Sequence, residues 1–249
     1  MVACAALVAG ALLGCSNKET QSLRPLLAPS WKTELALSGF GPATVALPLG
    51  ATTPRPIVVA LHGDGDRAEW QCGSFRGLLG GSVFIVCPQG VPAKLPERYT
   101  WGDVAATSAE LRAALAALKS RFGKHVAPSP IVLLGFGQGG SLAAELARQE
   151  PSFFARVALI DGDPAAMSPS ASAIFAQRGG KRVLFFCTSA ECDDRAAMRA
   201  LLLSRAKVAT KVVRKDVGPY FDARYGAALA PELGWLLEGD ARFRASAGK

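Results

Sequence analysis

The most informative stretch of this chain is Pro130-Ile-Val-Leu-Leu-Gly-Phe-Gly-Gln-Gly-Gly-Ser-Leu-Ala-Ala144. Its apolar run at 131–134 is typical of a buried strand, because strands covered on both faces of a sheet are continuously apolar. The glycines that follow predict a tight turn, and residues 138–150 predict a helix. A strand, a glycine turn and a helix in this order indicate an α/β unit.

The same alternation of strands and helices extends over most of the chain. Strands are expected at 32–37, 44–47, 56–61, 83–87, 131–134, 157–160, 182–186 and 208–213. Helices are expected at 67–79, from a capping box at 107–110 to 122, and at 138–150, 193–207 and 227–237. This pattern predicts an α/β fold with a mostly parallel central sheet and helices on both faces.

Composition limits the class of protein. The chain has 249 residues, half of them apolar, which is enough for one large α/β domain or two small ones. Its formal net charge is +8, but the basic residues are scattered along the chain. Because no basic cluster is interleaved with aromatic residues, we expect no nucleic-acid partner.

The N-terminal segment indicates export. Residues 1–14 are apolar and uncharged, and they are fewer than the about 20 residues needed to span a bilayer. They fit the apolar region of a signal peptide. The segment ends in Leu12-Leu-Gly-Cys15, which resembles the bacterial lipobox. That resemblance implies that Cys15 is acylated and anchors the chain in a lipid bilayer. Because no Lys or Arg precedes the apolar run, an ordinary cleaved signal or a misplaced start is the alternative.

This interpretation divides the chain into three parts. Residues 1–14 are expected to be a lipoprotein signal peptide, residues 15–30 a polar and proline-bearing tether, and residues 31–249 one folded domain. The expected location is the bacterial cell envelope, at the outer membrane or facing the periplasm.

Four cysteines remain outside the signal segment and the lipobox. Four cysteines allow three pairings, and oxidising surroundings favour two disulfides. We expect Cys72 to pair with Cys87 and Cys187 with Cys192. A zinc site is the competing interpretation, but there is no Cys-x-x-Cys pair and no clustered histidine, so no metal is expected.

Four stretches resemble the α/β-hydrolase superfamily. They are Val58-Val-Ala-Leu-His-Gly63, Cys87-Pro-Gln-Gly90, Gly135-Phe-Gly-Gln-Gly-Gly140 and Leu233-Gly-Trp-Leu-Leu237. The resemblance covers roughly residues 30–245. It is closest to carboxylesterases, dienelactone hydrolases and polyhydroxyalkanoate-depolymerase-like proteins. The resemblance implies an α/β-hydrolase fold and a protein that uses no cofactor.

In that superfamily the nucleophilic serine lies in a Gly-x-Ser-x-Gly elbow. Gly135 and Gly139 match the motif, but Gly137 occupies the place of the serine. The nucleophile of an elbow has a strained positive φ, which glycine adopts freely. The resemblance implies that the turn is kept and its chemistry is lost.

The other members of a catalytic triad are an acid and then a histidine, in chain order. The acid candidates are Asp193 and Asp194, with Asp161 and Asp163 one strand earlier. The only histidines, at positions 62 and 125, precede the elbow. Pro219 or Tyr220 occupies the expected histidine position.

These observations favour an envelope lipoprotein without esterase activity. Its expected ligand is a small acyl or carbonyl compound, a glycan or a protein. The resemblance implies an oxyanion-hole-like site at the loop after the third strand and at the residue after the elbow. Its expected ligand-binding residues are His62, Gly63, Asp64 and Gln138.

Two alternatives stay open. The first is an active carboxylic-ester hydrolase that uses Ser141 or Ser74 as its nucleophile. The second is an NAD- or FAD-binding protein, because Gly135-x-Gly137-x-x-Gly140 is followed by Asp161, about 20 residues on, where a ribose-binding acid is expected. The mid-chain position of this fingerprint and the export signal count against a dinucleotide.

Overall fold

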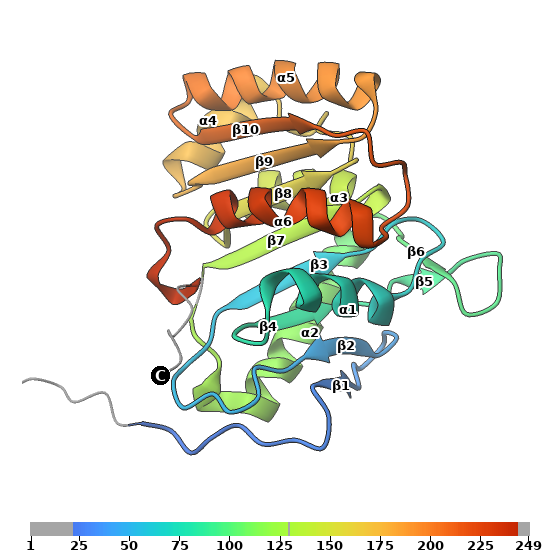
Figure 1. Cartoon of the computed structure of the whole chain (residues 1–249), viewed down its shortest axis with the longest axis vertical. Helices are drawn as coiled ribbons and strands as arrows, with labels where there is room; N and C mark the ends of the chain where they lie inside the picture. The colour runs from blue at the N-terminus through green and yellow to red at the C-terminus, as the bar shows by residue number, and fades with distance from the viewer. Residues whose placement is uncertain (1–21, 129, 244–249) are drawn as a thin grey trace, which may run out of the picture.

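The computed structural model describes residues 22–128 and 130–243, so the expected signal peptide, Cys15 and the start of the expected tether lie outside the described residues. One eight-stranded sheet has the order β1-β2-β4-β3-β7-β8-β9-β10 (Figure 1). Its strands are β1 (Lys32–Leu35), β2 (Ala43–Ala46), β3 (Ile57–Leu61), β4 (Phe84–Cys87), β7 (Ile131–Phe136), β8 (Phe154–Ile160), β9 (Arg182–Cys187) and β10 (Ala209–Arg214). Neighbouring strands from β4 to β10 pair in parallel, whereas β1 and β2 are antiparallel.

Helices cover both faces of this sheet. The helices of the described residues are α1 (Ala68–Leu79), α2 (Val104–Phe122), α3 (Gln138–Gln149), α4 (Pro169–Gln177), α5 (Ala190–Arg205) and α6 (Ala223–Leu237), with short 3-10 turns at Gly123–His125 and Ala241–Phe243. Helices α1 and α6 pack together on the face toward the viewer in Figure 1, and α2 to α5 pack on the other face. The predicted fold class is confirmed.

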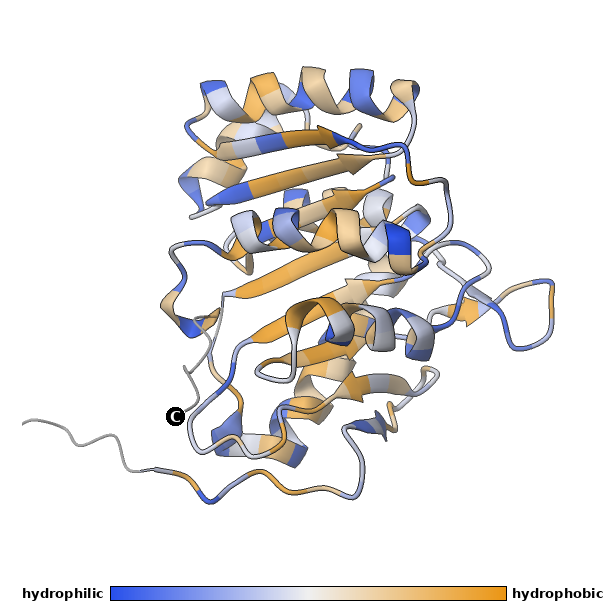
Figure 2. Ribbon diagram, viewed as in Figure 1, coloured by the Kyte–Doolittle hydropathy of each residue, from blue (hydrophilic) through white to orange (hydrophobic). Residues whose placement is uncertain are grey.

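Each face of the sheet has its own apolar core. Successive side chains of a strand point to opposite faces. Accordingly, Val59 and Leu61 of β3 join the core under α2 to α5, whereas Val58 and Ala60 join the core under α1 and α6. Figure 2 shows that the central strands are almost uniformly hydrophobic, whereas the helices have hydrophobic and hydrophilic residues. This difference places the strands in the interior and the helices on the outside.

The carboxyl ends of the parallel strands meet at one edge of the sheet, on the right in Figure 1. A small hairpin of β5 (Val91–Pro92) and β6 (Tyr99–Thr100) lies on the same side, as does the connection from β10 to α6. Ligand sites of open α/β sheets are found beyond this edge. The hairpin strands have only two residues each, which is too short for a periodic signal, and the sequence did not predict them.

One helix prediction was wrong at its start, and one helix was not predicted. The capping box expected at 107–110 does not begin α2, because Asp103 is its N-cap and accepts a hydrogen bond from the Ala106 N–H at 2.7 Å. Thr107 lies one turn inside the helix, and Glu110 is buried. Helix α4 was missed because its Ala- and Ser-rich sequence has no apolar period; its signal is Ser168 as N-cap followed by proline.

Both predicted disulfides are confirmed. Cys72 of α1 pairs with Cys87 at the end of β4, and Cys187 at the end of β9 pairs with Cys192 in α5. Each bridge therefore joins the carboxyl end of a strand to a covering helix, beside the edge where the site lies. Within residues 22–128 and 130–243 no helix has the length and apolar character needed to cross a membrane.

The two disulfides are expected to stabilise the domain unequally. They close loops with sequence separations of 15 and 5 residues, and a longer loop restricts the unfolded chain more. Replacing Cys72 and Cys87 by alanine should lower the free energy of unfolding by about 3 kcal/mol, and replacing Cys187 and Cys192 by about 2 kcal/mol. Chemical denaturation of both variants tests this. Equal losses, or a free thiol at one of these four cysteines in the denatured unreduced wild type, would contradict it.

Candidate functional site

The turn between β7 and α3 has the backbone of a nucleophile elbow. Gly137 has φ 54° and ψ −119°, which confirms the positive φ expected from the sequence. Its N–H donates to the Ile160 carbonyl at 2.8 Å, which ties the turn to β8. A Cβ at position 137 would meet only the Cα of Gly63 within 4 Å, at 3.6 Å. The turn therefore has room for a side chain but has none.

The neighbouring glycines are required by close backbone contacts. A Cβ on Gly135 would lie 2.2 Å from the Gly139 carbonyl oxygen, and one on Gly139 would lie 2.4 Å from the Leu61 carbonyl oxygen. Strand β7, helix α3 and the end of β3 can approach this closely only without side chains. The packing that supports an elbow is thus complete around Gly137.

Gln138, the first residue of α3, is held by the hairpin. Its Oε1 accepts a hydrogen bond from the Trp101 N–H at 3.2 Å. The same oxygen lies 2.9 Å from the Thr100 hydroxyl, whose single proton has a closer acceptor in Asp64 at 2.6 Å. Its backbone N–H lies in the first helical turn, where no intrahelical acceptor exists. Among the described residues this N–H has no hydrogen-bond partner, whereas the next one, of Gly139, donates to the His62 carbonyl. One oriented donor therefore remains beside the elbow.

His62 does not present its side chain to a ligand. The imidazole is fully buried and stacks on Trp101, with ring centroids 4.6 Å apart. Its Nδ1 lies 2.7 Å from the Gly63 carbonyl oxygen and its Nε2 lies 2.9 Å from the Gln89 carbonyl oxygen. The ring thus supports the loop, and only the backbone of His62 belongs to the site.

Glu110 completes this buried support. One of its carboxyl oxygens accepts the N–H groups of Gln89 and Gly90, each at 2.9 Å. Burial raises the pKa of Glu110, and these hydrogen bonds and the nearby His62 lower it in part. The sequence offered Glu110 only as part of a helix cap, so its role behind the loop could not be foreseen.

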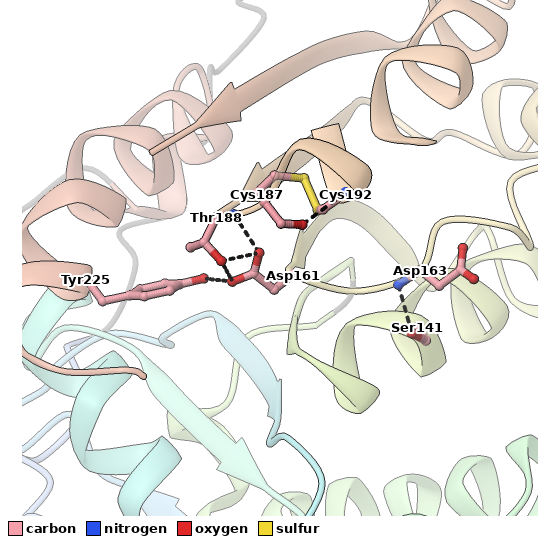
Figure 3. Close-up of a disulfide and its surroundings, with 8 residues drawn as sticks. Ser141, Asp161, Asp163, Cys187, Thr188, Cys192 and Tyr225 are labelled. Carbon is pink, nitrogen blue, oxygen red and sulfur yellow. Dashed lines mark hydrogen bonds between the residues drawn. A yellow bond between two sulfur atoms is a disulfide. The ribbon is translucent and has the colours of Figure 1, made fainter. Parts of the chain in front are cut away.

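The acid nearest the strand ends is Asp161, at φ 50° directly after β8. Figure 3 shows its carboxylate between Thr188 and Tyr225. It accepts the Thr188 N–H at 2.7 Å, the Thr188 hydroxyl at 3.0 Å and the Tyr225 hydroxyl at 2.7 Å. Both carboxylate oxygens are engaged within the protein, so Asp161 is not presented to a histidine or to a ribose.

The acids preferred from the sequence lie elsewhere. Asp193 and Asp194 belong to the first two turns of α5, the former half-buried and the latter exposed. Asp163 is next to Ser141 instead: its N–H donates to the Ser141 hydroxyl at 2.8 Å. The order of strands in the sequence could not identify which of these carboxylates lies nearest the elbow, because they all follow strands that end at the same edge of the sheet.

Tyr225 is the first residue of α6 whose side chain reaches the strand ends. It is fully buried, and burial together with the charge of Asp161 raises its pKa far above the ordinary range. The phenol therefore keeps its proton and acts as a hydrogen-bond donor. It cannot serve as a general base near neutral pH.

Phe221 lies where a triad histidine was sought. Its ring meets Phe136, the residue before Gly137, edge to face at 5.5 Å and stacks on Tyr225 at 5.0 Å. Pro219 and Tyr220, the candidates from the sequence, lie farther out, and the side chain of Tyr220 is 79% exposed. An aromatic stack thus links the elbow to the Asp161–Tyr225 pair.

A cavity of about 580 Å³ opens beside these residues, and we call it the elbow cavity. Gly63, Phe136 and Phe221 line the side next to the turn. Its other lining residues come from the 64–74 segment, the hairpin and the β10–α6 connection: Asp64, Gly65, Asp66, Trp70, Gln71, Ser74, Leu95, Arg98, Pro219 and Tyr220. Of the expected ligand residues, Gly63 and Asp64 line this cavity, and His62 and Gln138 do not.

The sequence matches no protein-family model and no curated protein. The structure, however, is similar to solved hydrolases. A carboxylesterase from Mesorhizobium loti is 18% identical with a TM-score of 0.58, over 82% of this chain and 99% of that one. A putative dienelactone hydrolase from Klebsiella pneumoniae subsp. pneumoniae is 17% identical with a TM-score of 0.58, over 83% and 98%.

A third similar structure is a dienelactone hydrolase-like promiscuous phosphotriesterase from metagenomic libraries. It is 17% identical with a TM-score of 0.55, over 82% of this chain and 97% of that one. All three belong to one structural superfamily. This chain has the α/β-hydrolase fold.

In this fold the Gly-x-Gly-x-x-Gly pattern at 135–140 forms the turn between β7 and α3. Asp161, the acid that a dinucleotide site would need, is hydrogen-bonded to Thr188 and Tyr225. Across residues 22–128 and 130–243, no group of three or more His, Cys, Asp and Glu side chains is placed to hold a metal ion.

Removing the Tyr225 hydroxyl is expected to destabilise the fold in a pH-dependent way. Tyr225→Phe deletes a hydrogen bond to a carboxylate, which should cost about 1.5–3 kcal/mol at neutral pH. Because folding raises the pKa of Tyr225, the wild type keeps this advantage below pH about 10 and loses it at higher pH.

The measurement is the free energy of unfolding of both proteins between pH about 7 and 11. The difference should narrow above pH about 10, by at most about 1.4 kcal/mol per unit. Tyr220→Phe, at an exposed tyrosine, is the control and should match the wild type. A constant difference would contradict the buried, protonated phenol.

Proposed function

We propose that this chain is a bacterial envelope lipoprotein whose α/β-hydrolase-fold domain binds a ligand in the elbow cavity and does not hydrolyse it. The observation that carries the proposal is Gly137, a glycine with the backbone of a catalytic elbow and no nucleophilic atom. The fold alone leaves activity open, since one fold serves many functions. The argument for binding without catalysis therefore rests on the residues of the site.

The site lacks a histidine that could act as general base, as well as a serine at the elbow. The sequence has no histidine after position 125, and its two histidines are occupied elsewhere. His62 is buried between two carbonyl oxygens, and His125 lies 2.8 Å from the Arg24 carbonyl oxygen. A triad needs an imidazole within hydrogen-bond reach of its nucleophile. Both functions of the triad are absent together, which favours a lineage freed from catalysis.

The alternative of a relocated nucleophile lacks a base as well. Ser74 lines the elbow cavity but has no imidazole beside it. The Ser141 hydroxyl accepts the Asp163 N–H, and the Asp163 carboxylate accepts the Ala165 N–H at 3.0 Å. Neither serine has the activating partner that raises the nucleophilicity of a hydroxyl.

The remaining parts of the site support binding. The elbow cavity lies within the roughly 300–1,000 Å³ range of small-molecule sites. The unpaired N–H of Gln138 lies at the turn and outside the cavity lining, so it is suited to the oxygen of a ligand that extends from the cavity to the turn. In an active hydrolase this donor would stabilise an oxyanion.

Restoring the serine is expected to cost stability without giving activity. Gly137→Ser supplies a hydroxyl but no base, and a side chain at this φ should lower the free energy of unfolding by about 1–3 kcal/mol. Gly137→Ala should lose the same amount, because the cost is conformational. Denaturation and hydrolysis of p-nitrophenyl acetate and butyrate by the full chain measure both effects.

For this prediction, saturable hydrolysis by the wild type that persists through repeated purification would refute the proposal. Turnover by Gly137→Ser alone would reveal a base that already serves the elbow. A larger loss of stability in Gly137→Ser than in Gly137→Ala would show a clash in place of conformational strain.

The lipid anchor is expected at Cys15. Its support is the apolar segment that ends in Leu12-Leu-Gly-Cys15. Mass spectrometry of the mature protein should find an N-terminal acylated cysteine, and the protein should partition into a detergent phase. Cys15→Ala should leave an unacylated precursor or a soluble protein, with Cys4→Ala as the control. A wild-type protein that is free of lipid and fully soluble would refute the anchor.

A further inference from the structure

The polar lining of the elbow cavity has both signs of charge. Asp64 and Asp66 contribute carboxylates, and Arg98 contributes a guanidinium that has no ion pair within the described residues. Asp64 accepts the Thr100 hydroxyl at 2.6 Å and Asp66 accepts the Arg67 N–H at 2.8 Å, each through one oxygen. The lining thus offers acceptors and donors side by side. An anionic ligand would meet two carboxylates, and a cationic one would meet Arg98.

Arg98 is held as a fixed donor. Its guanidinium carbon lies 4.4 Å from the ring centroid of Trp70, in cation–π contact. Stacking fixes the plane of the five N–H donors, so little side-chain entropy remains to be lost when they bind oxygen. Such a group suits a ligand with several neighbouring oxygens.

Gln71 gives an independent sign of a ligand. It lines the elbow cavity and is only 2% exposed, and its Nε2 has no hydrogen-bond partner among the described residues. A buried donor without an acceptor costs about 1–3 kcal/mol, and such groups are rare in folded proteins. A ligand oxygen in the cavity would satisfy this amide once the side chain rotates toward the cavity that Gln71 lines.

Aromatic surface faces the same cavity. Tyr220 is 79% exposed although it is large and partly apolar, and Trp70 is 48% exposed.

A second cavity of about 510 Å³ adjoins the first, since both are lined by Asp64, Gly65, Leu95 and Arg98. The two together form a trough that runs from the elbow along the β5–β6 hairpin. Two adjoining cavities of about 510 and 580 Å³ suit a ligand of several linked units better than one small molecule.

From these features we infer that the trough binds a neutral oligosaccharide. Sugar hydroxyls both donate and accept hydrogen bonds, which matches Asp64, Asp66, Arg98 and Gln71 together. The C–H faces of sugar rings pack on exposed aromatic rings such as Tyr220. An aliphatic acyl chain would leave these polar groups unmatched. The inference rests on the proposed function and names the ligand class of that same site.

Titration calorimetry of the full chain with cellotriose, xylotriose and triacetylchitotriose tests the inference. At least one should give saturable binding, with hexanoate and benzoate binding more weakly. Arg98→Ala and Tyr220→Ala should each weaken it tenfold or more, which is 1.4 kcal/mol. Tyr220→Phe keeps the ring and should keep binding. Trp235→Ala is the matched control, because Arg182 and Lys211 flank that tryptophan outside the trough.

Gln71→Leu separates binding from folding. Leucine removes the unsatisfied donor at similar size, so the free energy of unfolding should stay equal or rise while saccharide affinity falls tenfold or more. A loss of stability with unchanged affinity would show that Gln71 is structural and would overturn its assignment.

The other outcomes of the binding experiment also distinguish the saccharide inference from the proposed function. Binding of carboxylates alone would overturn the saccharide class and leave the proposed function standing. Saccharide binding that Arg98→Ala and Tyr220→Ala do not affect would place the site elsewhere and refute the inference. Absence of binding by all three saccharides would refute it too. Ester turnover is a separate readout, and only turnover would refute the non-catalytic function.

Discussion

A left-handed backbone turn at Gly137 is the constraint on which the site depends. The turn lets strand β7 end against β3 and β8 while helix α3 begins at once, and the contacts of Gly135 and Gly139 leave no space for side chains there. A residue with a side chain is strained in such a turn, and enzymes keep it for its chemistry. In this chain a glycine occupies the turn, so the turn carries neither this strain nor a side-chain nucleophile at position 137.

The acid nearest the strand ends is paired within the protein. The carboxylate of Asp161 is satisfied by Thr188 and by a tyrosine that stays protonated, and Phe221 packs between this pair and the elbow. The residues beside the turn therefore form a packed aromatic support next to the elbow cavity. The ligand recognition that we propose for the trough needs fixed donors and acceptors, and the cation–π contact holds Arg98 as one such donor.

The sequence predicted those features that depend on local pattern. Continuous apolar runs identified the parallel strands, the glycine spacing identified the elbow, and the cysteine positions at strand ends and helix starts allowed both disulfides to be paired. It could not predict side-chain neighbours that are distant in sequence. Asp161 and Tyr225 are 64 residues apart, and only the fold brings them together. The buried place of the His62 ring, behind the loop and not in the cavity, likewise depends on Gln89 and Trp101.

A complete elbow without a nucleophile should not react with a fluorophosphonate, a reagent that forms a covalent adduct with an activated serine. Intact-protein mass spectrometry after incubation with an excess of this reagent measures the reaction. We expect an unchanged mass for the wild type, with an active α/β-hydrolase labelled in parallel as the positive control. A stoichiometric adduct that maps to Ser74, Ser141 or any other serine near the elbow cavity would show that the site has an active nucleophile and would refute a non-catalytic elbow.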